Sequence, residues 1–251
     1  MIWPRRCVAL WEGDSVRRLV LALDALMGFR EATHSGDIGV AAAVTLAELA
    51  GVDAVRLGID DELKLVSESD VLDARRVARR FELRMTASPG LLKVALEARP
   101  DRVLLTASAR DGGWAGGPLD FRAGAQPLAP VMHGLQEAGI PVSLRVPPKL
   151  GAVKVAHAEG ATGVELYTGA ILDLPAAERK AELESLADAV RLAAKLQLRI
   201  AIGGGLGYAT ASEVLDRIPA TEYVAVGRAA ISRALLVGLD RAVRDLRAAV
   251  Q

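Results

Sequence analysis

The chain has 251 residues, of which 51% are hydrophobic, and it contains a single cysteine, Cys7. Lys and Arg together number 31, as do Asp and Glu, so the formal net charge is zero and a broad nucleic-acid-binding surface is not expected. One cysteine excludes an internal disulfide and a thiolate metal cluster, and no apolar run approaches the roughly 20 residues that cross a bilayer. With no secretory leader recognisable at its start, we expect a cytoplasmic α/β protein without a membrane or nucleic-acid partner.

Short β-rich runs alternate with Ala-, Leu- and Arg-rich helical patterns along the whole chain. The predicted strands are 19–23, 54–57, 82–86, 103–106, 141–146, 163–167, 199–202 and 223–226. The predicted helices are 39–50, 69–80, 90–98, 127–138, 150–159, 176–196, 209–217 and one from residue 230. Eight such units, with several strands too apolar to alternate, indicate a parallel sheet covered by helices. The predicted fold is a single (β/α)8 TIM barrel over residues 15–251, preceded by an N-terminal extension at 1–14.

The connection between Thr106 and Pro127 is unusually long and rich in glycine for a strand-to-helix loop. It follows the fourth predicted strand, so it lies on the face of the barrel where an active site is expected. A long loop at that place is typical of a lid over a site, and we predict that role for it.

Two glycine-rich turns lie near the C-terminus, each at the end of a predicted strand. The first is Gly203-Gly204-Gly205 and the second is Gly227-Arg228. The last two strand-to-helix turns of a TIM barrel commonly form a phosphate site, because glycine lets backbone N–H groups approach an anion beside a helix N-terminus. The alternative is that these glycines only make tight turns. Because Arg228 adds a positive charge beside Gly227, we predict phosphate or carboxylate binding here.

Six stretches, in order along the chain, resemble the pyridoxine 5'-phosphate synthase family, whose barrel makes the vitamin B6 ring. They are 23–30 in the first unit, 50–55 before the second strand, 138–144 into the fifth, 164–169 at the sixth, 203–206 at the seventh and 226–229 at the eighth. The resemblance runs from about Arg18 to the C-terminus. It implies a TIM barrel that condenses 1-deoxy-D-xylulose 5-phosphate with 3-amino-2-oxopropyl phosphate, without metal or organic cofactor.

The resemblance is closer in architecture than in chemistry. Residues that match the family pattern are Arg30, Glu165, Thr168, Gly169, Gly203, Gly205 and Gly227. The family's proton-transfer histidines are replaced by other residues, which are Arg56, Tyr167, Gly204 and Arg228. Its strand-3 glutamate, the general base, is replaced by Arg84, and an arginine on its second strand by Gly58. Arginine stays protonated at neutral pH, so we expect the family's ring closure to be lost.

Three histidines remain in the chain, and none of them ends a predicted strand. His133 and His157 fall on predicted helices, where a structural role is expected. His34 follows the first strand on the expected active face and is the only histidine that we consider for catalysis. Glu165 and Tyr167 are two residues apart, so they share one face of the sixth strand. The candidate catalytic residues are therefore Glu165, with Tyr167 assisting it, and His34.

Several arginines occupy positions that correspond to the family's active site. Because strand side chains alternate, Arg56, Arg84 and Arg228 are expected to point into the barrel mouth, and Arg145 on the fifth strand can join them. Arginine is well shaped for a bidentate grip on phosphate or carboxylate, so we predict an anion pocket that Glu165 partly neutralises. The alternative is that some of these arginines point outward or pair with surface acids.

Three functions remain open from the sequence. The first is a diverged barrel that binds a small phosphorylated or polyanionic metabolite. If this barrel is an enzyme, we expect a cofactor-independent transferase, lyase or isomerase in which Arg56 and Arg84 stabilise developing negative charge. The second is a non-catalytic ligand sensor or a partner of another protein. The third is an active pyridoxine 5'-phosphate synthase with rearranged catalytic residues. No metal or organic cofactor is expected, and the resemblance implies a homo-oligomer.

Overall fold

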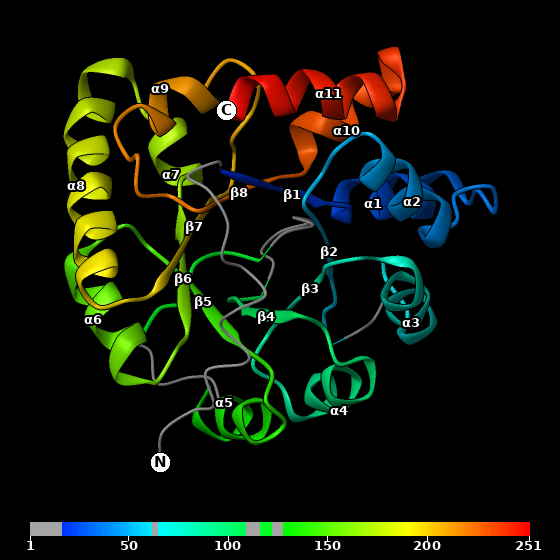
Figure 1. Cartoon of the computed structure of the whole chain (residues 1–251), viewed down its shortest axis with the longest axis horizontal. Coiled ribbons are helices and arrows are strands. Elements are labelled where there is room, and N and C mark those ends of the chain that lie inside the picture. The colour runs from blue at the N-terminus through cyan, green and yellow to red at the C-terminus, as the bar shows by residue number, and fades with distance from the viewer. Residues whose placement is uncertain (1–16, 62–64, 109–115, 122–127) are drawn as a thin grey trace.

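A computed structural model describes residues 17–61, 65–108, 116–121 and 128–251. Within these ranges the chain forms a closed barrel of parallel strands with helices around it (Figure 1). The predicted TIM barrel is therefore confirmed. The predicted N-terminal extension and most of the predicted lid lie outside the described residues.

Each strand of the barrel pairs in parallel with the next one in the sequence, and the last strand pairs with the first. The strands are β1 (Arg18–Ala22), β2 (Ala54–Gly58), β3 (Phe81–Met85), β4 (Arg102–Leu105), β5 (Val142–Val146), β6 (Gly163–Tyr167), β7 (Arg199–Gly203) and β8 (Tyr223–Val226). Each boundary lies within one residue of its prediction. Because parallel strands all end at the same edge, the turns after them meet at one mouth.

The helices cover the outside of the barrel and shield the outward-facing apolar side chains of the strands. They are α1 (Asp24–Thr33), α2 (Val40–Leu49), α3 (Glu68–Val77), α4 (Pro89–Ala98), α5 (Leu128–Glu137), α6 (Leu150–Ala158), α7 (Gly169–Leu172), α8 (Ala176–Lys195), α9 (Ala211–Leu215), α10 (Arg228–Val237) and α11 (Leu239–Val250). Helices α1 and α7 were not predicted. The single helix predicted from residue 230 is divided into α10 and α11 by Gly238, which has a φ of 82°.

Charged side chains fill the middle of the barrel, together with a small apolar cluster. The apolar cluster contains Val20, Ala54, Ala201, Tyr223 and Ala225. The strand register sets acids beside bases, since Glu82 of β3 lies between Arg56 of β2 and Arg102 of β4, and Arg145 of β5 lies beside Glu165 of β6. The order of charges around the sheet therefore favours ion pairing between neighbouring strands.

These five side chains form one continuous chain of ion pairs across the barrel. Arg102 pairs with Glu82, whose other oxygen accepts from Arg56 Nη2 at 2.8 Å. The same Nη2 donates to Glu165 Oε2 at 2.6 Å, and Arg145 Nη2 lies 2.7 Å from Glu165 Oε1. All five side chains are at most 8% exposed. We name this cluster, which consists of Arg102, Glu82, Arg56, Glu165 and Arg145, the barrel ion chain.

An aromatic ring closes the lower end of the barrel ion chain. The Arg102 guanidinium lies 4.3 Å from the centre of the Tyr223 ring, and Arg18 Nη1 donates to the Tyr223 hydroxyl at 3.0 Å. A guanidinium over an aromatic face is attracted by the negative charge of the ring face. Tyr223 therefore keeps Arg102 in contact with Glu82 on the side that faces away from the mouth.

Removing one carboxylate from the barrel ion chain is expected to destabilise the protein strongly. Glu82→Gln keeps the shape of the side chain but removes the buried charge that Arg102 and Arg56 share, and leaves Arg56 with Glu165 alone, which costs about 3–5 kcal/mol of unfolding free energy. Asp73→Asn is the matched control, because Asp73 pairs with Arg76 on the exposed surface of α3 and should cost about 0–1 kcal/mol. Urea denaturation measures both values, and equal costs would contradict the proposed role of burial.

Candidate functional site

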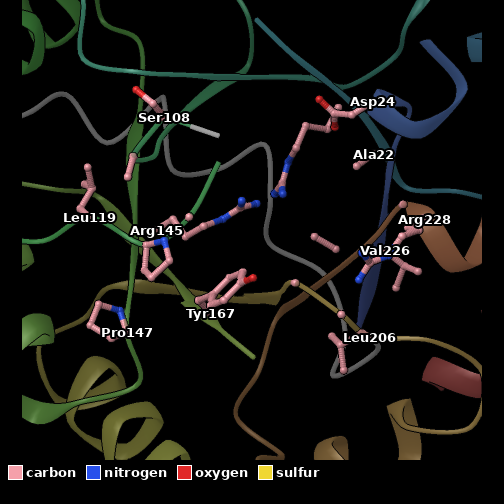
Figure 2. Close-up of a pocket in the computed structure, with 18 of the residues that line it drawn as sticks. Ala22, Asp24, Ser108, Leu119, Arg145, Pro147, Tyr167, Leu206, Val226 and Arg228 are labelled. Atoms are coloured by element: carbon pink, nitrogen blue, oxygen red, sulfur yellow. The ribbon is translucent and has the colours of Figure 1, made fainter. Parts of the chain in front are cut away.

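A cavity of about 1490 Å³ opens at the mouth of the barrel, where the strands end. Figure 2 shows Arg145 and Tyr167 extending toward its middle, with Arg228 on one side and Ser108 on another. Seven of the residues predicted for the site line it, and these are Arg56, Arg145, Tyr167, Gly204, Gly205, Gly227 and Arg228. The cavity therefore coincides with the predicted anion pocket at these residues.

The N-terminus of α10 opens onto this cavity. Gly227 is its N-cap and supplies no capping side chain. The first backbone hydrogen bond of the helix runs from Ile231 N to Gly227 O at 3.1 Å. The N–H groups before Ile231 are therefore left for solvent or a ligand, at the positive end of the helix dipole. Arg228, the first residue of α10, is exposed on the cavity wall and makes no ion pair with any described residue.

The turn after β7 supplies a second stretch of bare backbone on the cavity wall. Gly204 and Gly205 have φ values of 93° and 77°, a left-handed conformation that side chains rarely adopt. Thr168 fixes this turn from behind, because its hydroxyl donates to the carbonyls of Gly203 at 3.2 Å and Gly204 at 2.5 Å. Thr168 is buried and is not part of the cavity wall, so it positions the turn rather than contacting a ligand.

The ring of Tyr167 lies between two glycines. A Cβ atom added to Gly204 would lie 2.6 Å from Tyr167 Cδ2, and one added to Gly169 would lie 2.5 Å from Tyr167 Cζ. The centre of the same ring is 6.0 Å from the Arg145 guanidinium carbon. Both glycines therefore leave room for a tyrosine at the end of β6, which explains them without a ligand. The Tyr167 hydroxyl makes no hydrogen bond with any described residue.

Glu165, predicted as the acid/base residue, is held between two arginines beneath the cavity. It is fully buried, and its two oxygens accept from Arg56 and Arg145. Burial alone would raise its pKa, but the charges of Arg56 and Arg145 outweigh burial and lower the pKa from 4.5 to about 2. Such a carboxylate stays ionised at neutral pH and is a poor proton acceptor.

Arg84, predicted to stabilise negative charge, is paired with an acid at the start of α1. Arg84 Nη2 donates to Asp24 Oδ1 at 3.0 Å, and both side chains are at most 8% exposed. The two groups cross above Gly58, where an added Cβ atom would overlap both of them. Asp24 lines the cavity and Arg84 does not. Glu165 pairs with Arg56 and Arg145, as the expected partial neutralisation requires, whereas Arg84 is corrected from the anion pocket to a buried pair with Asp24.

Arg30 and His34 lie away from the cavity, at the other end of α1. Arg30 forms two hydrogen bonds with Asp70, at 2.9 and 2.8 Å, and donates to Leu65 O at 2.9 Å. It therefore joins α1 to the start of α3. His34 is the exposed C-cap of α1, with a φ of 51°. Neither residue lines the cavity.

Sequence reasoning missed the residues that neutralise the arginines, which are Glu82 and Asp24. Glu82 had a usable signal, because it lies two residues before Arg84 and therefore shares the inward face of β3. Asp24 had a weaker signal, its place directly after β1 at the mouth. Within the described ranges, no group of three or more His, Cys, Asp or Glu side chains could hold a metal ion, and no helix is long and apolar enough to span a membrane.

Comparison with known proteins identifies the family. Residues 19–251 match the family model described as pyridoxal phosphate biosynthesis protein PdxJ. The chain belongs to this family. A pyridoxine 5'-phosphate synthase of Synechococcus sp. (strain JA-2-3B'a(2-13)) is 36% identical over 230 residues, which are 91% of this chain and 96% of the relative. The synthase of Geobacter metallireducens is 34% identical over 231 residues, with the same coverage.

Solved structures support the PdxJ-family barrel at the level of the fold alone. A thiamine phosphate pyrophosphorylase from Pyrococcus furiosus has a TM-score of 0.58 at 18% identity and covers 94% of this chain and 96% of its own. A 3-hexulose-6-phosphate synthase from Salmonella typhimurium has a TM-score of 0.60 at 16% identity and covers 93% and 98%. The resemblance stated from the sequence is therefore confirmed for the family and for the fold.

Enlarging Gly169 should displace Tyr167 and destabilise the mouth of the barrel. Gly169→Ala is expected to cost about 1–3 kcal/mol of unfolding free energy, the usual range for overpacking a filled site. In a Tyr167→Ala background the same change should cost much less, because the ring is no longer there. Urea denaturation of the four proteins gives the coupling energy, and additive costs would contradict the contact.

The low pKa of Glu165 predicts a specific loss of stability in acid. The folded pKa of about 2 lies below the ordinary 4.5, so the stabilisation is complete above about pH 4.5 and is lost as the pH falls toward 2. The expected loss from this residue is about 3 kcal/mol. Glu165→Gln, which starts less stable at pH 7, should lose less between pH 4.5 and 2. Parallel pH curves for the two proteins would contradict the assignment.

Proposed function

We propose that this PdxJ-family member binds a small phosphorylated metabolite at the barrel mouth, with the phosphate on α10 and the turn after β7. The observation that carries the proposal is Arg228, an exposed guanidinium on the cavity wall with no acidic partner among the described residues. Its neighbours are the uncapped N–H groups of α10 and the left-handed Gly204–Gly205 turn. A helix N-terminus, glycine backbone and a free arginine are together well suited to a phosphate group.

We further propose that the site binds its ligand without performing the family's condensation. The resemblance assigns that chemistry to histidines and a glutamate, and the described cavity wall carries no histidine. Glu165 has a pKa of about 2 and is therefore ionised near pH 7, and Asp24 forms an ion pair with Arg84. Proton transfer near pH 7 needs a group that exchanges protons there. These observations favour ligand binding, as in a sensor, over ring closure.

A second candidate function is pyridoxine 5'-phosphate synthesis itself. The observation in its favour is the 36% identity to a relative of that name across 91% of this chain. Under this proposal Tyr167, Asp120 and Lys149, which line the cavity, would be the candidates for proton transfer. A direct assay with both substrates separates the two candidates, because formation of pyridoxine 5'-phosphate above background would establish the second.

Arg228→Ala tests the phosphate site. Wild-type protein should show a saturable rise in Tm with pyridoxine 5'-phosphate or 1-deoxy-D-xylulose 5-phosphate, because a ligand that binds only the folded state stabilises it. Arg228→Ala should weaken the affinity by about 10- to 100-fold, through loss of a charge-assisted contact. Arg217→Ala is the matched control, since Arg217 is also exposed, has no ion pair with a described residue and lies away from the cavity.

Two outcomes would contradict the phosphate site. One is that no phosphorylated compound raises the Tm of the wild-type protein. The other is that Arg228→Ala and Arg217→Ala bind the ligand equally well.

A further inference from the structure

The cavity floor offers a second set of hydrogen-bond donors. These donors are buried, whereas Arg228 at the phosphate site is exposed. Arg56 and Arg145 of the barrel ion chain line the cavity, whereas their carboxylate partners Glu82 and Glu165 do not. The carboxylates lie behind the guanidinium groups, so the floor presents positive charge to whatever enters. The pKa of Arg145 is lowered by burial, against the pull of Glu165, and by the charges of Arg56 and Arg84.

Arg56 has one nitrogen that the barrel ion chain does not use. Its side chain is only 2% exposed, and its Nε and Nη2 donate to Glu82 and Glu165. Its Nη1 has no hydrogen bond with any described residue, although Arg56 lines the cavity. This nitrogen is therefore a donor that is left for a ligand atom in the cavity.

The Tyr167 hydroxyl is a second hydrogen-bond donor in the cavity that no described residue uses. Figure 2 shows the side chain extending into the cavity beside Arg145. The ring is held in place by contacts with Gly169 and Gly204, so the hydroxyl is positioned before a ligand arrives. Arg56 and Tyr167, each with one donor that no described residue uses, thus line the same cavity.

The number and kind of these donors indicate a carboxylate. A carboxylate has two oxygens and forms strong charge-assisted hydrogen bonds with a guanidinium, whereas a phosphate has three oxygens to satisfy. The cavity volume of about 1490 Å³ exceeds the roughly 300–1,000 Å³ of ordinary ligand pockets, so it has room for a ligand that spans both sets of donors. Among the described residues, the acids that line the cavity are Asp24, which is paired with Arg84, and Asp120, which is exposed.

We propose that the barrel mouth takes a phosphorylated carboxylic acid, with its phosphate at Arg228 and α10 and its carboxylate at Arg56 and the Tyr167 hydroxyl. This inference rests on the proposed phosphate site and adds the second anionic group of the ligand. It predicts a preference between two compounds that share a phosphate and differ in the group at the other end.

Two three-carbon probes make the comparison direct. 3-Phosphoglycerate carries a phosphate and a carboxylate, whereas glycerol 3-phosphate carries a hydroxymethyl group in place of the carboxylate. Isothermal titration calorimetry of the wild-type protein should give a Kd for 3-phosphoglycerate that is at least about 10-fold lower than the Kd for glycerol 3-phosphate. Equal affinity for the two probes would overturn the carboxylate site and leave the phosphate site standing. Absence of binding by both probes would overturn the phosphate site and the carboxylate site together.

Two variants separate a specific contact from general attraction of charge. Tyr167→Phe keeps the ring between its glycines and removes only the hydroxyl, so it should weaken 3-phosphoglycerate binding severalfold and leave glycerol 3-phosphate unchanged. Arg56→Lys keeps the charge beside Glu82 and Glu165 but removes Nη1, and it should reduce the preference further. Arg228→Ala should weaken both probes by the same factor. A preference that survives Tyr167→Phe and Arg56→Lys, in variants with native circular dichroism, would overturn the proposed contacts.

Discussion

The mouth of this barrel depends on two buried carboxylates, Glu82 and Glu165, which hold three guanidinium groups inside a closed sheet. Removing charges from water is unfavourable unless each one meets a partner with good geometry. The strand register meets that condition, because it sets each acid beside an arginine on the next strand. The same contacts fix the orientation of Arg56 and Arg145. The cationic floor of the cavity is thus a product of barrel packing and is present before any ligand binds.

The barrel ion chain also decides what chemistry is available. A carboxylate between two arginines has a strongly lowered pKa, so Glu165 contributes charge to the barrel rather than a proton to a reaction. Arg84 forms a buried ion pair with a second acid at the mouth, Asp24. The described cavity wall carries Arg56, Arg145, Lys149 and Arg228 against Asp24 and Asp120, so positive charge predominates. Such a wall suits an anion, in line with the proposed binding function.

The sequence was sufficient for the strands and for part of the site. Short β-rich runs marked all eight strands, whereas α1 was missed because its N-cap, Leu23, carries no capping side chain. The glycine turns and Arg228 were found because their signal is local. Glu165 was expected to neutralise the arginines although it is 109 residues from Arg56, because the resemblance placed both at the mouth, whereas Glu82 and Asp24 were missed. Arg30 was assigned to the site by resemblance, and its contacts instead hold α3.

Gly58 limits which side chains can follow Arg56 and Leu57 at the end of β2. The Arg84–Asp24 pair fills the space above Gly58, where even a methyl group would overlap it. By the resemblance, the family has an arginine at position 58 and a glutamate at position 84, so the residues at these two positions depend on each other sterically. A larger side chain at position 58 would have to displace the Arg84–Asp24 pair from its place above β2.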